Sequence, residues 1–137
     1  MNKRFFASLS GAEEVPPVET LAFGETTLQL NEEGTKLHYR LMVNNLQRFI
    51  EAHIHLGARG ENGPIVAFLF GPASPSISVN RATVQGIITE DDLVGPLEGQ
   101  PFSALIQQML AGNTYVNVHT ERHPAGEIRG QIRKVPN

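Results

Sequence analysis

The stretch that decides the fold is Lys36-Leu-His-Tyr-Arg-Leu-Met-Val43, in which apolar and polar residues alternate. An alternation with a period of two predicts a β-strand with one buried face. His38 and Arg40 are expected to face solvent, because side chains alternate across a strand. The residues expected to face the core are Leu37, Tyr39, Leu41 and Val43.

Further strands are expected on both sides of this stretch. Short β-compatible runs separated by turn residues indicate strands at 4–10, 21–30, 51–56, 64–70, 82–88, 114–119 and 127–133. Two short helices are expected between them, one beginning at Thr89 and one across residues 101–111. Such an element order predicts an all-β Greek-key sandwich or barrel of about seven or eight strands, with the helices in the crossovers.

Length and composition fit a single domain. The 137 residues are 40% hydrophobic and include 13 Gly and 9 Pro, which suits one turn-rich β domain over residues 1–137 with its core at about 4–134. A net charge of −3 without a basic stripe argues against a nucleic-acid partner. No segment approaches about 18 apolar residues, and the first residues lack the apolar run of an export signal, so neither a membrane span nor a signal peptide is expected.

Three histidines are predicted to share the outer face of the sheet. In Ala52-His53-Ile54-His55 the strand period places both imidazoles opposite Ile54. Val116 and Val118 face the core in the same way, which leaves His119 on the outer face. Imidazoles at this spacing can bind one copper or zinc ion, and with no Cys in the chain only imidazole and oxygen ligands are available. A three-histidine site follows if the two strands are close in the sheet.

Several other side chains are candidates for supporting roles. His123, in the following loop, is a weaker candidate for a fourth ligand. Glu127 and Arg129 could orient the ligand rings or meet an anion, with a structural ion pair or network as the alternative. Glu14 and Glu51 are expected to be solvated carboxylates. The alternative for the histidines themselves is a polar network in which each ring bonds to loop carbonyls.

Three separated segments resemble the CHRD family, the chordin-type domains. They are residues 9–18 (LSGAEEVPPV), residues 52–64 (AHIHLGARGENGP), and residues 115–120 (YVNVHT) together with 124–130 (PAGEIRG). They span nearly the whole chain in the right order. The resemblance implies a domain type found largely in secreted or surface proteins, and hence an extracellular or cell-surface location, but it names no substrate.

A more distant similarity concerns the histidines. The His53-Ile-His55 pair and the glycine-rich loop ending at Gly63-Pro64 look like the copper-binding start of Cu/Zn superoxide dismutases, which are also Greek-key barrels. That similarity implies a late copper ligand at His119 and an anion-guiding arginine at Arg129. The chain departs from the dismutase pattern because it lacks the bridging histidine, the other zinc ligands and the disulfide cysteines. A mononuclear site fits this pattern better than a two-metal site.

The sequence therefore predicts a CHRD domain that binds copper or zinc through His53, His55 and His119, and it favours a non-enzymatic role over an enzymatic one. No nucleophile motif of the Gly-x-Ser-x-Gly type supports covalent catalysis. Two alternatives stay open. One is a structural or adhesive surface module, or a homo-oligomer, that needs no metal. The other is a copper-dependent oxidoreductase similar to superoxide dismutase.

Overall fold

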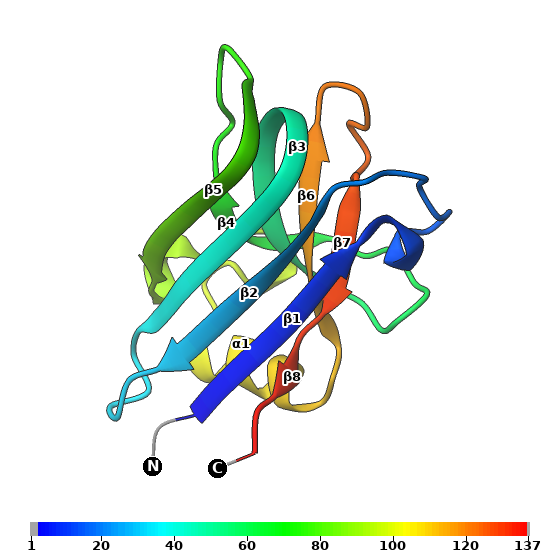
Figure 1. Ribbon diagram of the computed structural model, residues 1–137. Helices are drawn as coiled ribbons and strands as arrows, with labels where there is room; N and C mark the ends of the chain where they lie inside the picture. Colours follow the sequence, from blue (N-terminus) through cyan, green and yellow to red (C-terminus); the bar gives the residue numbers. More distant parts are fainter. Residues whose placement is uncertain (1–2, 137) are drawn as a thin grey trace.

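The chain folds around one long strand, β3 (Leu37–Leu56), in a computed structural model that describes residues 3–136 (Figure 1). The other strands are β1 (Lys3–Ser10), β2 (Phe23–Leu30), β4 (Ile65–Phe70), β5 (Ile77–Ile88), β6 (Thr114–Thr120), β7 (Ile128–Gln131) and β8 (Arg133–Lys134). The helices described are α1 (Phe102–Leu110) and three 3-10 turns, η1 (Gly11–Glu13), η2 (Glu90–Asp92) and η3 (Gly95–Leu97). The prediction of an all-β class with little helix is confirmed.

The two halves of β3 pair with different strands. The first half lies between β2 and β5, and the second half lies between β6 and β4, all antiparallel. Because β1 pairs with both β2 and β7, and β7 pairs with β6, the strands β1, β2, β3, β6 and β7 close into a barrel. Strands β4 and β5 extend this barrel along the remaining edge of β3. Strand β3 therefore closes the barrel, because its first half pairs with β2 and its second half pairs with β6.

The prediction of separate strands at 36–43 and 51–56 was wrong, because both stretches belong to β3. Asn45 and Arg48 adopt φ values of 55° and 58°, and the pairing with β5 shifts register between Leu46 and Phe49. Non-glycine residues in the left-handed region bend a strand locally, as in a β-bulge. The bend carries β3 around the barrel without ending it.

Three other predicted boundaries also need correction. Strand β5 begins at Ile77, before the predicted residue 82. The predicted last strand, 127–133, is split at Ile132 into β7, which pairs with β6, and β8, which pairs with β1. The helix predicted at Thr89 is only the single turn η2, closed by a capping box between Thr89 and Asp92.

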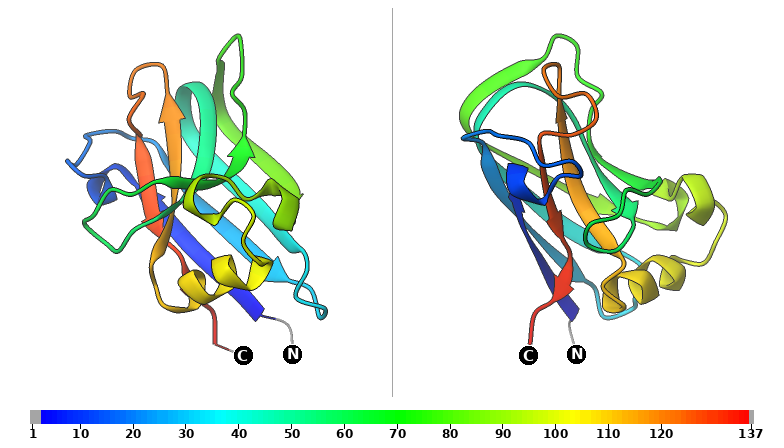
Figure 2. Two further views of the ribbon diagram at one scale, coloured as in Figure 1. Left: turned by 180° about the vertical axis from the view of Figure 1, so that it is seen from behind. Right: turned by 90° about the vertical axis from the view of Figure 1, so that its right-hand side faces the viewer.

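The core is one cluster of buried apolar side chains inside the barrel. Leu37, Leu41 and Val43 are fully buried, as the alternation predicts. Tyr39 is only half-buried, and its hydroxyl donates to the carbonyl of Leu69 at 2.6 Å. Helix α1 covers the end of the barrel near the termini (Figure 2). It contributes Phe102, Leu105, Ile106 and Met109 to the core. None of the helices within residues 3–136 has the length and apolar character that a membrane span needs.

We expect Ile54→Ala to lower the free energy of unfolding by about 2–5 kcal/mol, because it leaves a cavity beneath the second half of β3. Ile87→Ala is the matched control. Ile87 is 49% exposed, so its truncation should change stability by less than about 0.5 kcal/mol. Urea denaturation followed by circular dichroism measures both changes, and equal losses in the two variants would contradict this description of the core.

Candidate metal centre

The three histidines lie together because β3 and β6 are neighbours. His53 is opposite Asn117, and His119 is opposite Glu51, so that His119 is diagonal to His53. Diagonal neighbours on one face of a sheet are within reach of aromatic side chains. One ring nitrogen from each of His53, His55 and His119 lies within 4.8 Å of one from each of the others. The strand adjacency that the sequence left open is therefore present.

All three rings are buried, although they project from the outer face of the barrel. Their exposed fractions are 1% for His53, 7% for His55 and 8% for His119. The loop 57–64, which crosses the outside of β6 and β7 (Figure 2), and the loop 121–126 both contact the rings. The edge of Phe68 on β4 packs against His53, with ring centroids 4.6 Å apart. The cluster is thus shielded from water on the outside of the sheet.

Backbone carbonyls orient two of the rings. Nδ1 of His55 lies 2.9 Å from the Gly63 carbonyl, and Nδ1 of His119 lies 2.8 Å from the Pro124 carbonyl. Since a carbonyl oxygen only accepts, Nδ1 carries the proton in the neutral form of each ring, and Nε2 then carries the lone pair. A Cβ at Gly63 would lie 1.7 Å from the Leu56 carbonyl, so this position requires glycine. The loop thereby sets the tautomer of His55.

The opposite nitrogens of these two rings have no partner. Nε2 of His55 and Nε2 of His119 are buried, and nothing in the described part of the chain bonds to them. The alternative of a network with loop carbonyls therefore accounts for the Nδ1 side of the rings alone. Histidines that bind metals usually donate one nitrogen to a carbonyl or carboxylate and offer the other to the ion. His55 and His119 have this arrangement.

His53 has a carboxylate beside it where the other rings have carbonyls. Oε1 of Glu51 lies 2.8 Å from Nε2 of His53. The two groups are not aligned for a hydrogen bond, and within residues 3–136 neither nitrogen of His53 has a partner. The expectation that Glu51 is simply solvated was therefore wrong. Because Glu51, His53 and His55 alternate along one strand, the strand period was the signal that places Glu51 on the same face.

His53 and His55 are neutral at neutral pH. Burial lowers the pKa of His53 to about 3, and the neighbouring His119 and His55 lower it further. Burial also lowers the pKa of His55 to about 4, against the opposing effect of its bond to the Gly63 carbonyl. The contact between Glu51 and His53 is therefore one of a carboxylate with a neutral imidazole and not an ion pair. Neutral imidazole is the form that binds metal ions.

Arg129 supports His55 through an intervening tyrosine. Its guanidinium carbon lies 3.5 Å from the ring centroid of Tyr115. The Tyr115 ring stacks on His55 with centroids 4.7 Å apart and planes 7° apart. Because β6 lies between β3 and β7, the histidine and the arginine cover opposite faces of the tyrosine. The stack fixes the plane of the His55 ring.

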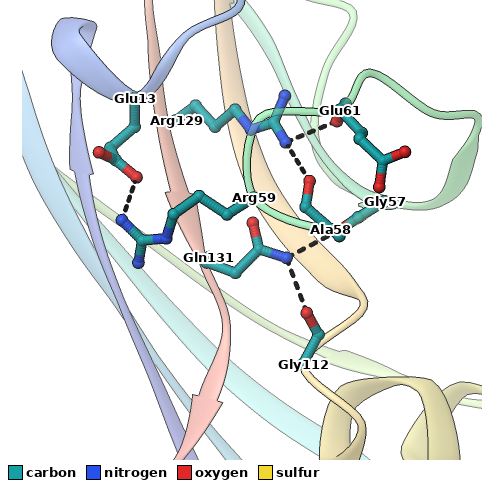
Figure 3. A network of polar contacts seen from close by, with 8 residues as sticks. All are labelled: Glu13, Gly57, Ala58, Arg59, Glu61, Gly112, Arg129 and Gln131. Carbon is teal, nitrogen blue, oxygen red and sulfur yellow. Dashed lines mark hydrogen bonds and ion pairs between the residues drawn. The ribbon is translucent and has the colours of Figure 1, made fainter.

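The same guanidinium holds down the loop that contacts His55 (Figure 3). Arg129 donates to the carbonyls of Ala58 at 3.0 Å and Glu61 at 2.6 Å, and to Oδ1 of Asn62 at 3.1 Å. The side chain of Gln131 bonds to the carbonyl of Gly57 at 2.8 Å. Arg129 is 1% exposed, so its guanidinium is committed to the loop and not presented to anions in solvent.

Glu127 and His123 have other surroundings. The Glu127 carboxylate accepts hydrogen bonds from the hydroxyls of Thr20 at 2.6 Å and Thr120 at 2.8 Å. It therefore ties the segment before β2 to the end of β6. His123 lies in the loop 121–126, where its backbone N–H bonds to Thr120, and it is outside the group of ring nitrogens that the described residues form.

Glu14 is a buried carboxyl that the sequence did not reveal. It was expected to be solvated, but it is 6% exposed and accepts a hydrogen bond from the side chain of Asn117. Burial raises its pKa to about 7, while the Asn117 bond and the charge of Arg129 act in the opposite direction. Its burial depends on contact between segments 103 residues apart, so no local pattern indicates it.

Comparison with known proteins gives a family match over most of the chain. A family model described as the CHRD domain matches residues 5–132. Chordin from Xenopus laevis is 29% identical over 137 residues, which cover 94% of this chain and 13% of that chordin. Chordin from Danio rerio is 28% identical over 131 residues, with 94% of this chain and 13% of that chordin covered. The chain therefore spans about an eighth of the length of these relatives.

The pKa of Glu14 predicts a pH-dependent stability. The folded state holds the proton more tightly than the unfolded chain, because burial raises the pKa from 4.5 to about 7. Glu14 therefore destabilises the fold progressively as the pH rises through that interval, by up to roughly 3 kcal/mol. The lowered pKa values of His53 and His55 act in the opposite direction over the same pH range, because these rings resist protonation in the folded state. The contribution of Glu14 is therefore measured as the difference between the unmodified protein and Glu14→Gln in urea denaturation at about pH 5 and about pH 8.

Relative to the unmodified protein, Glu14→Gln should be more stable at about pH 8 than at about pH 5, so this substitution should alter the pH dependence of stability. Glu13→Gln, one residue away, should leave it in place, because Glu13 lies in an exposed contact with Arg59. An unchanged pH dependence in Glu14→Gln would show that the buried carboxyl is not its source.

Proposed function

Because this chain belongs to the CHRD domain family, we propose that it is a chordin-like module that binds one copper or zinc ion through His53, His55 and His119. The observation that carries the proposal is the set of buried ring nitrogens without a hydrogen-bond partner among the described residues. A buried acceptor that lacks a partner costs about 1–3 kcal/mol. A metal ion would satisfy three such acceptors at once.

The spacing and chemistry of the rings support this assignment. Two nitrogens held at about 2.0–2.1 Å from one ion lie about 3.4 Å apart at the tetrahedral angle. The observed limit of 4.8 Å therefore requires the nitrogens to move by roughly 1 Å or less. Imidazole nitrogen suits copper and zinc, whereas calcium and magnesium prefer oxygen. Three protein ligands would leave a fourth position open to water or another small ligand.

The proposal does not extend to superoxide dismutation. The similarity to Cu/Zn superoxide dismutases implies that Arg129 guides an anion. Its guanidinium instead bonds to the loop 57–64 and stacks on Tyr115. Its position favours a supporting role. The extracellular location implied by the family resemblance is part of the same proposal, as is any partner that the module binds within a longer protein.

A surface module that assembles without metal is the second candidate function. The observation that favours it is strand β5, which pairs with β3 alone among the strands within residues 3–136. It also carries the exposed side chains Ile77 and Ile87. A long edge strand with apolar side chains is a template for pairing with another chain. Ordered assemblies that persist in a chelator, seen by light scattering, would support this candidate over the metal.

We expect tag-free protein to bind one zinc or copper ion per chain, measured by calorimetry and by elemental analysis after desalting. His119→Ala and His55→Ala should each weaken binding by at least about 100-fold, because each removes a direct ligand. His38→Ala is the matched control, since His38 is exposed on the first half of β3 and should leave binding unchanged. His123→Ala should also bind as the unmodified protein does.

Circular dichroism checks that each variant is folded. If the unmodified protein bound neither ion more tightly than His119→Ala, the three histidines would not form a metal site.

A further inference from the structure

We infer that Glu51 sets the tautomer of His53, so that His53 offers Nδ1 to the ion while His55 and His119 offer Nε2. The role of this tautomer in binding an ion rests on the proposed metal-binding function. The tautomer itself is a property of the metal-free protein, so it can be measured whether or not a metal binds.

The position of Glu51 carries the inference. Glu51 precedes His53 by two residues on β3, and its Oε1 lies 2.8 Å from Nε2 of His53. It is paired in register with His119, so it lies at the border of the cluster between two of the rings. Its side chain is 25% exposed. The 2.8 Å separation is a hydrogen-bond distance, and the inference requires the carboxylate to rotate into line with the ring N–H.

The chemistry of the two groups decides the tautomer. A neutral imidazole has one N–H and one lone pair, and an ionised carboxylate only accepts. The proton of His53 is therefore favoured on Nε2, the nitrogen beside Glu51, and the lone pair on Nδ1. That Nδ1 is buried and has no partner within the described part of the chain. The carbonyls at His55 and His119 impose the reverse arrangement, so the three rings use two tautomers.

Glu51 is assigned as a positioning residue and not as a fourth ligand. The group of ligand atoms that lie within 4.8 Å of one another contains the three histidines and no carboxylate among the described residues. A carboxylate that accepts from the far nitrogen of a metal-binding histidine fixes the ring and makes it a stronger base. Loss of such a partner typically weakens metal binding about 10–100-fold.

Long-range ¹H–¹⁵N correlation NMR of the metal-free protein tests the assignment. We expect His53 in the Nε2–H form and His55 and His119 in the Nδ1–H form. We also expect a downfield Nε2–H proton for His53 that exchanges slowly with water. An Nδ1–H tautomer at His53 would overturn the inference.

Variants at position 51 test whether the carboxylate is the cause. In Glu51→Ala the His53 N–H proton should shift upfield and exchange faster, and zinc affinity should fall about 10–100-fold. Glu51→Gln should restore part of the His53 N–H shift and part of the zinc affinity, because its amide oxygen can still accept a hydrogen bond. Glu25→Ala removes an exposed carboxylate from β2, opposite the first half of β3, and should change neither. Unchanged Nδ1–H signals from His55 and His119 show that each variant is folded around the cluster.

The outcomes separate this inference from the metal proposal. If Glu51→Ala alters the His53 N–H but the unmodified protein binds no metal, the role of Glu51 stands and the metal proposal falls. If the unmodified protein binds zinc, and Glu51→Ala leaves both the His53 N–H and the affinity unchanged, Glu51 has no such role.

Discussion

The antiparallel register between β3 and β6 is the constraint on which the rest of the structure depends. It places His53 opposite Asn117 and Ile54 opposite Val116, so one face of the pair is polar and the other apolar. A slip of one residue would exchange these faces and bury imidazoles in the core. Ile54, Val116 and Val118 are fully buried, so their burial opposes that slip. The packing of the core thereby determines where the histidine rings lie.

An outer face with this many polar side chains needs a cover if it is to be shielded from water. The loop 57–64 supplies that cover on one side, and the contacts of Arg129 and Gln131 hold it there. The Gly63 carbonyl in this loop also orients His55. One buried arginine therefore contributes twice to the cluster, since it anchors the loop and stacks on the tyrosine that packs against His55. The fold therefore holds the imidazole rings in a fixed orientation before any metal ion binds.

Local alternation in the sequence accounts for the elements and for the face of each histidine. The period of two predicted the buried position of Ile54 and the outer position of His119. Glu51 was expected to be solvated, although the same period, extended to residue 51, puts it on the face of the histidines. The period could not predict that β3 continues through Asn45 and Arg48. Both residues adopt left-handed φ values, and a sequence that allows such values looks like that of a turn. Contacts between distant segments were equally inaccessible. The burial of Glu14 and the stack of Arg129 on Tyr115 depend on strand order, which periodicity does not encode.

The most direct test of the metal centre is anomalous X-ray scattering from crystals grown with zinc, recorded above and below the zinc absorption edge. The account predicts one strong anomalous peak between the rings of His53, His55 and His119, about 2.0–2.1 Å from one nitrogen of each. Crystals that show zinc only at exposed side chains, with water or no density between the three rings, would contradict it.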